Sequence, residues 1–141
     1  MDADGAFRRF GGEIRLEDGR PETAAGRLTV EVASIDTGIG MRDNHLRSAD
    51  FFDAERHSQA TFVATAVRLE STRLVVSGEL TIRGVTRPLT VPVAVTVTPD
   101  SLRITGDLSV NRREFGVAYQ SRLNPVADDV KVSVDITAVA R

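Results

Sequence analysis

The chain has 141 residues, a formal net charge of -2 and no cysteine. This length fits one domain over residues 1–141, because a single hydrophobic core commonly serves roughly 100–200 residues. The slightly acidic balance argues against a nucleic-acid partner, which would require a basic surface. The lack of cysteine excludes disulfides, thiolate metal ligands and cysteine nucleophiles.

The beginning of the chain, Met1-Asp2-Ala3-Asp4-Gly5, is acidic and lacks the basic and apolar regions of a secretory signal. No apolar run approaches the roughly 20 residues that a transmembrane helix needs. We therefore expect a cytoplasmic protein without stable membrane insertion, or a periplasmic or secreted one if a leader has been removed.

In the first half of the chain, hydrophobic patterning predicts strands over residues 7–16, 28–34 and 61–69, and a loop over 19–22. One short helix is expected from Met41 to about Ala49. Two patterns support this helix, an apolar face and an ion pair between residues four apart. The face would hold Met41, His45, Ala49 and Phe52, and the pair would be Asp43 with Arg47.

In the second half, apolar and polar residues alternate strictly, which is typical of half-buried strands. The pattern predicts four strands over residues 73–83, 89–97, 102–110 and 130–138, with a hairpin at Gly84-Val85 and a turn over 98–101. About seven short strands with one helix indicate an all-β protein, and the consecutive hairpins favour an antiparallel up-and-down barrel. Its inward residues are largely Val, Ala and Gly, so either an apolar cavity or an ordinary packed core is compatible with the composition.

Several motifs resemble the YceI-like family of lipocalin-like, polyisoprenoid-binding proteins. They stand in family order at residues 34–38, 41–53, 60–62, 78–88, 111–116 and 129–139. The resemblance implies a lipocalin-like barrel that holds a long-chain isoprenoid, an isoprenoid quinone or a similar lipid, without a cofactor or a reaction.

The sequence departs from the family pattern at its beginning, where an opening strand with an aromatic residue and a His-Ser pair usually precedes the 7–16 segment. Without that strand the barrel is expected to remain incompletely closed. An unpaired strand edge tends to aggregate unless it is covered, so a partner chain, a relocated N-terminus or a truncated chain is implied. Ser58 also replaces a proline that is usual in the family.

The expected ligand contacts fall into two sets. The apolar tunnel set contains Phe7, Phe10, Val30, Val32, Phe52, Phe62, Ala64, Val76, Leu80 and Phe115. The polar head-group or cap set contains Arg42, Asp43, His45, Asn111 and Arg112.

Each polar candidate also has a structural interpretation. Arg42 and Asp43 either orient a head group or form an ion pair that holds the helix over the barrel. His45 either bonds to the barrel wall or contacts the ligand, and Asn111-Arg112 either form a turn or touch the ligand. A metal site is not expected, because the two histidines lie 12 residues apart without nearby cysteine. Asp50 and Asp53 could form a general acid/base pair, but the sequence offers no positioned nucleophile beside them. A solvated cap or turn role is therefore expected for both.

These observations predict a non-catalytic lipid carrier or sequestering protein in which the segment from Arg42 to Phe52 controls ligand access. The alternative is a structural or interaction module with a filled core that uses its open edge for oligomerisation. A two-fold contact between open faces would bury both gaps, so we also expect a homodimer.

Overall fold

The computed structural model describes residues 4–121 and 126–140. Seven strands form one antiparallel sheet in the order β2-β3-β5-β6-β7-β8-β9, while β1 and β4 pair separately. The sheet strands are β2 (Phe10–Glu17), β3 (Arg20–Glu31), β5 (Gln59–Glu70), β6 (Arg73–Ile82), β7 (Val85–Val97), β8 (Ser101–Asn111) and β9 (Asp129–Val139). The remaining elements are β1 (Ala6–Phe7), the 3-10 helix η1 (Val32–Ser34), β4 (Ile35–Asp36), the helix α1 (Gly40–Arg47) and the 3-10 helix η2 (Arg112–Phe115).

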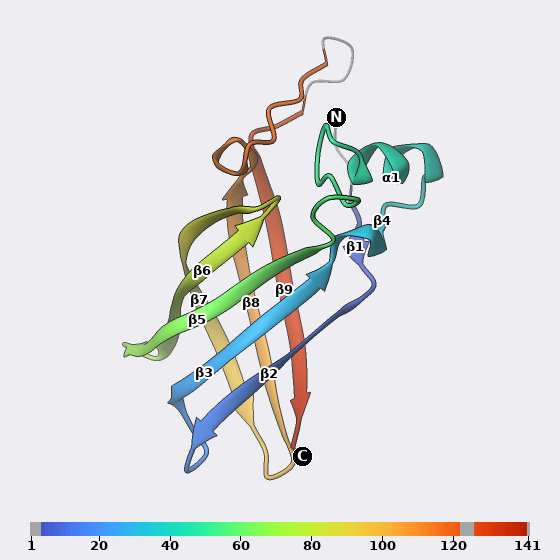
Figure 1. Ribbon diagram of the computed structural model, residues 1–141. Helices are drawn as coiled ribbons and strands as arrows, with labels where there is room; N and C mark the ends of the chain where they lie inside the picture. The colour runs from blue at the N-terminus through green and yellow to red at the C-terminus, as the bar shows by residue number, and fades with distance from the viewer. Residues whose placement is uncertain (1–3, 122–125, 141) are drawn as a thin grey trace.

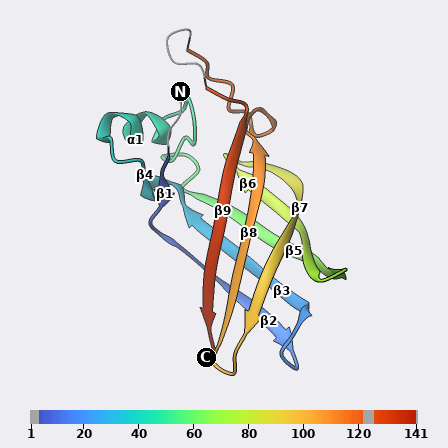
Figure 2. The same ribbon diagram turned by 180° about the vertical axis from the view of Figure 1, so that it is seen from behind.

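The sheet curls into a half-barrel in which β8 and β9 form the wall opposite β2 and β3 (Figures 1 and 2). Since every neighbouring pair is antiparallel and the sheet has seven strands, its edges β2 and β9 run in the same direction. Within the described residues no ladder joins these two edges. The predicted antiparallel barrel-like fold is confirmed, together with its incomplete closure.

The alternating patterns place one apolar row per strand on the concave side. Across β6 and β7, for example, Leu74 pairs with Val93 and Val76 pairs with Val91. Gly78 continues the β6 row, where a Cβ atom would lie only 2.3 Å from the carbonyl oxygen of Val63. A glycine is therefore needed where strands β5 and β6 approach each other.

Three predicted boundaries in the first half are wrong. The 7–16 strand is two strands, β1 and β2, interrupted at residues 8–9. The 19–22 loop is a tight turn at Asp18-Gly19, both at positive φ, and β3 begins directly afterwards at Arg20. The 28–34 strand ends at Glu31, because the chain then tightens into η1 and the Ser34 hydroxyl donates to the Glu31 carbonyl at 2.6 Å. The turn, rather than the polar composition of 19–22, determines where the strand starts.

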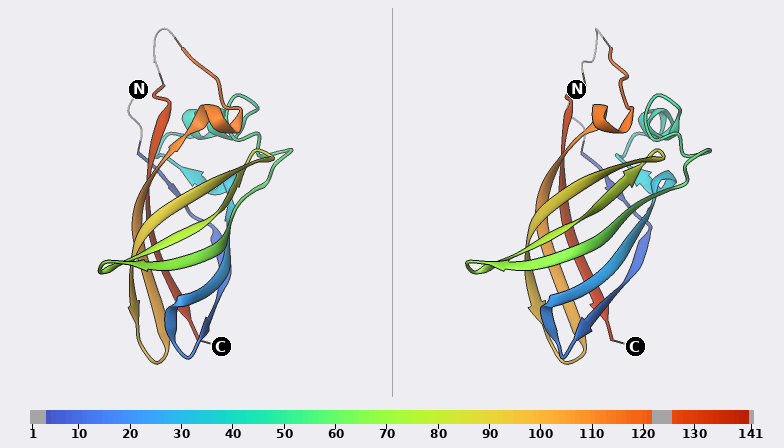
Figure 3. Two further views of the ribbon diagram at one scale, coloured as in Figure 1. Left: turned by 90° about the vertical axis from the view of Figure 1, so that its left-hand side faces the viewer. Right: turned by 60° about the vertical axis from the view of Figure 1, so that its left-hand side comes forward.

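One end of the half-barrel, which we call the capped end, carries α1 and η2 (Figures 1 and 3). The turns that join β2 to β3 and β7 to β8 lie at the opposite end, the hairpin end (Figure 1). Five of the most buried apolar side chains belong to the segments of the capped end. They are Val32, Ile35, Phe51, Phe115 and Val117.

The predicted helix is confirmed at Gly40–Arg47, but its predicted buried face is wrong. Met41 is 86% exposed. Asp43 is instead the helix residue that is buried, and it does not pair with Arg47 in the described part of the chain. Polar contacts to the preceding loop, rather than an apolar stripe, hold this short helix. No helix in residues 4–121 and 126–140 is long and apolar enough to cross a bilayer.

Candidate ligand-binding face and its cap

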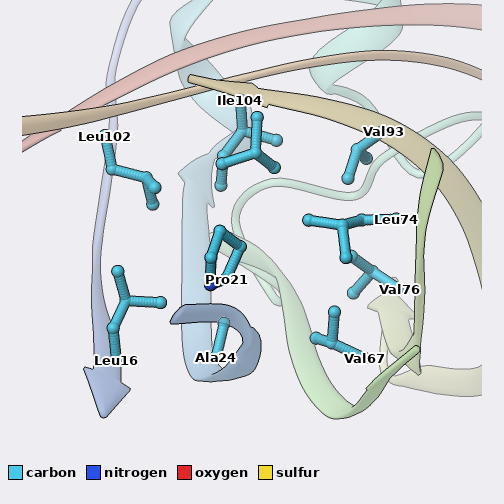
Figure 4. A pocket seen from close by; sticks show the side chains of 10 residues that line it. Leu16, Pro21, Ala24, Val67, Leu74, Val76, Val93, Leu102 and Ile104 are labelled. Atoms are coloured by element: carbon cyan, nitrogen blue, oxygen red, sulfur yellow. The ribbon is translucent and has the colours of Figure 1, made fainter. Parts of the chain in front are cut away.

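The concave face of the sheet holds a partly open apolar cavity of about 40 Å³ between the two sides of the half-barrel (Figure 4). Its walls come from β2, β3, β5, β6, β7 and β8. The lining residues are Leu16, Pro21, Ala24, Val67, Leu74, Val76, Val93, Val95, Leu102 and Ile104. No charged side chain contributes to this wall.

The enclosed space is much smaller than a tunnel for a long lipid. A volume of about 40 Å³ would hold only a few water molecules. The rest of the concave face is bordered by β2 and β9, between which the described residues form no ladder. Its apolar side chains remain accessible even at the edges, where Phe10 of β2 is 52% exposed and Val130 of β9 is 45% exposed.

Six of the ten predicted tunnel residues lie on the concave rows of the sheet. They are Phe10, Val30, Phe62, Ala64, Val76 and Leu80. Among them Val76 lines the cavity. The other four lie outside these rows, in the segments of the capped end. They are Phe7 of β1, Val32 of η1, Phe52 after α1 and Phe115 of η2.

Nine of the ten cavity residues, all except Val76, lie outside the predicted tunnel set, and three of them, Leu16, Pro21 and Ala24, come from the β2–β3 hairpin. Pro21 fell in the predicted loop, and Ala24 lay outside every predicted strand. The signal that could have found them is the Asp18-Gly19 turn, which brings β2 and β3 together as a hairpin from Arg20 onward.

Arg42 and Asp43 do not form the predicted ion pair with each other. Both bind Thr37 in the loop before α1 instead. Arg42 Nε donates to the Thr37 hydroxyl and Nη2 donates to the Thr37 carbonyl, each at 2.8 Å. The Thr37 amide and hydroxyl donate to Asp43 Oδ1 at 2.9 and 2.5 Å. We call α1, η2 and their adjoining loops at the capped end the cap. These contacts make the two residues part of the cap rather than of the concave face.

His45 contacts its own segment and the chain after η2. Its Nε2 lies 2.8 Å from Asp50 Oδ2, and its ring meets Phe51 and Tyr119 edge-on at centroid distances of 5.1 and 4.8 Å. Phe51 and Tyr119 also contact each other. This aromatic cluster joins α1 to the segment that follows η2, and Tyr119 is a member that the sequence analysis did not identify.

Asn111 and Arg112 organise the turn at the end of β8. Asn111 Oδ1 accepts a hydrogen bond from the Arg113 amide at 3.0 Å and so caps η2. Arg112 is buried and donates to the carbonyls of Val117, Ala127 and Val126 at 2.9, 3.0 and 3.2 Å. The predicted turn is confirmed, and the Arg112 guanidinium binds three backbone oxygens and lies 3.5 Å from the Asp128 carboxylate.

Two further arginines bind backbone carbonyls at the capped end. Arg83, at the β6–β7 turn, donates to the carbonyls of Ala49 and Gly116 and so links the α1 segment to η2. Arg47 donates to the carbonyls of Ala33 and Ile35 at 2.8 and 3.2 Å. Charged donors thus satisfy carbonyls that loops would otherwise leave unpaired.

Asp36 beside the cap has a lowered pKa. The backbone amide of Gly38 donates to its carboxylate at 2.9 Å, and this bond is the main cause; Arg8, at 3.3 Å, lowers the pKa further. Both partners favour the charged carboxylate. The group is exposed, so we treat it as a feature of the cap's surface rather than as a catalytic acid.

The comparison with family models decides the family of the chain, since the model of the YceI-like domain matches residues 1–138. The chain belongs to the YceI-like family. A UPF0312 protein of Photorhabdus laumondii is 39% identical over 85 residues, which are 60% of this chain and 44% of that protein. Protein YceI of Escherichia coli O157:H7 is 38% identical over 86 residues, 61% of this chain and 45% of that protein. The matched region therefore spans less than half the length of these relatives.

Solved structures agree with the YceI-like fold. BcnA of Burkholderia cenocepacia superimposes with a TM-score of 0.86 at 31% identity, covering 95% of this chain and 86% of BcnA. The YceI protein of Campylobacter jejuni gives a TM-score of 0.86 at 21% identity, over 100% and 86% of the two chains. A polyisoprenoid-binding domain from Saccharophagus degradans gives 0.67 at 16% identity, over 83% and 77%.

Asp50 and Asp53 of this YceI-like chain lie in the segment after α1 at the capped end. The Asp50 carboxylate contacts His45, while Asp53 is buried and its carboxylate lies 3.9 Å from the Arg56 guanidinium. These contacts support the predicted cap and turn roles over an acid–base pair. Within the described ranges, no group of three or more His, Cys, Asp or Glu side chains could hold a metal ion.

Proposed function

We propose that this YceI-like chain binds a long-chain apolar lipid, such as a polyisoprenoid or an isoprenoid quinone, without transforming it. The observation that supports this proposal is the wall of the cavity, which no charged side chain lines, together with the exposed apolar side chains at the edges of the concave face. Removing each methylene-sized group of a lipid from water stabilises the complex by roughly 0.8 kcal/mol, so an apolar wall alone supplies the affinity. The polyisoprenoid-binding domain of Saccharophagus degradans shares the fold, which is consistent with this ligand class.

Because the enclosed cavity is small, a long ligand requires either displacement of the wall or a cover over the open groove. A second copy of the chain supplies such a cover. A two-fold axis across the opening would set β2 against β2 and β9 against β9 of the partner, each pair antiparallel. This homodimer would pair both edges and join two small cavities into one larger space. Sedimentation of the ligand-loaded protein over a wide concentration range tests it, and a chain that stays monomeric contradicts it.

Native mass spectrometry tests lipid binding. The protein is stripped of lipid and then incubated with an octaprenol, and we expect a bound adduct. Replacing Ala64 and Val76 with Phe adds bulk to the concave face and should abolish the adduct, at an overpacking cost of roughly 1–3 kcal/mol.

The matched control is Ala66→Phe, since Ala66 pairs with Ser77 on the other face of the sheet and is exposed. This variant should retain the adduct. If neither the wild type nor the control takes up octaprenol while the protein still dimerises, the alternative function, an interaction module with a filled core, is correct. If the double variant still binds, the lipid lies elsewhere.

A further inference from the structure

The two ends of the half-barrel differ in how they are closed. At the capped end, Arg83 joins the α1 segment to η2, and His45, Phe51 and Tyr119 pack ring against ring. Arg112 binds three carbonyls there. A lipid that passed through this end would have to break several of these contacts together.

Near the hairpin end, and at the β5–β6 turn that projects from the side of the half-barrel (Figure 3), the rows that line the cavity continue outward into solvent. Leu69 follows Val67 on the concave row of β5 and is 67% exposed, and Val97 follows Val95 on the concave row of β7 and is 42% exposed. Leu69 pairs with Leu74, which itself lines the cavity. Apolar side chains therefore extend without interruption from the cavity to the rim.

Leu69 and Val97 leave apolar surface of the rim open to water. They suit the passage of an apolar chain, which loses little solvation as it moves from one apolar side chain to the next. Arg68 and Glu70 flank Leu69 in sequence and bind each other at 3.1 Å. The charges of the two residues that flank Leu69 therefore balance each other.

We propose that the apolar tail of the lipid enters through the hairpin end, past Leu69 and Val97, and that the tied segments of the capped end stop its advance. This inference rests on the proposed function. It corrects the expectation that the segment from Arg42 to Phe52 controls access, because those residues are bound to one another and to the loop before α1. The lipid's polar head then remains at the rim, facing water.

The test uses the absence of native cysteine, which allows single thiols to be placed and blocked reversibly. Leu69→Cys and Val97→Cys would each be converted to a mixed disulfide with glutathione, a bulky and charged adduct. The control is Met41→Cys, because Met41 is 86% exposed on α1 at the capped end. Uptake would be followed as transfer of a fluorescent geranylgeranyl lipid from phosphatidylcholine vesicles.

We expect glutathione at either rim position to slow uptake several-fold, dithiothreitol to restore it, and glutathione at position 41 to have no effect. Slower uptake with the adduct at 41 and unchanged uptake with the rim adducts would place access at the capped end and overturn the inference. Unchanged uptake with all three adducts would also overturn it and place access at the open groove between β2 and β9. Failure of the unmodified protein to take up the lipid would instead refute the proposed function.

Discussion

Replacing Arg112 with Met distinguishes a structural role for this arginine from a ligand-binding role. The guanidinium is only 5% exposed, and it donates to three carbonyls at 2.9–3.2 Å. Hydrogen bonds from charged donors contribute about 1.5–3 kcal/mol each. The Val117 carbonyl bond is buried, whereas the other two are only partly buried, so water can replace them in the variant. We therefore expect a loss of about 3 kcal/mol in the free energy of unfolding, less than three full bonds.

Urea unfolding followed by circular dichroism measures this loss, and Arg113→Met is the matched control. Arg113 pairs with Asp128 at 2.6 Å, but its side chain is 46% exposed, so its removal should cost no more than about 1 kcal/mol. Arg112→Lys keeps the charge but cannot reach three carbonyls at once, and its stability should lie between the two. Normal stability of Arg112→Met together with a loss of lipid affinity would refute the structural role and assign Arg112 to the ligand.

Two further perturbations follow from backbone proximity and from electrostatics. Gly78→Ala places a Cβ 2.3 Å from a carbonyl oxygen and should lower the free energy of unfolding by roughly 1–3 kcal/mol, whereas Gly11→Ala meets no atom within 4 Å and should be nearly neutral in the same denaturation assay. Equal effects of the two would contradict the close approach of β5 and β6. Because the pKa of Asp36 is lowered in the folded state, its contribution to stability is present above the ordinary pKa of 3.8 and is lost as the pH falls through the lowered pKa. Asp36→Asn should therefore be less stable than the wild type near neutral pH, and the difference should close in acid; a difference that grows as the pH falls would be the wrong sign.

The resemblance to the YceI-like family and the sheet of the second half were both available from the sequence. Strict alternation from Leu74 to Ala138 predicted four strands whose concave rows pair as expected, for example Leu74 with Val93. This succeeds because the side-chain period of a strand is a local property of the chain. Phe62 and Ala64 were predicted as tunnel residues, and the register places them on the same concave face as Leu80.

The individual roles of the cap residues could not be predicted from the local spacing of residues in the sequence. Arg42, Asp43 and Arg112 were read as head-group candidates, yet the first two bind Thr37 and the third binds carbonyls up to 15 residues away. A sequence shows that such a donor exists but not which backbone oxygens the fold leaves unpaired near it. Tyr119 was overlooked because its partners, His45 and Phe51, are more than 60 positions earlier in the chain.

The sequence by itself determined the antiparallel sheet, its apolar concave face and the short helix, since each depends on spacing between nearby residues. Only the tertiary structure decided that the cavity reaches Pro21 and Ala24, that it is small, and that the two ends are closed so differently. These properties depend on how far the sheet curls and on which distant segments meet. The curl of the sheet is the total of the small twists between neighbouring strands across all seven strands. No single stretch of sequence therefore predicts it.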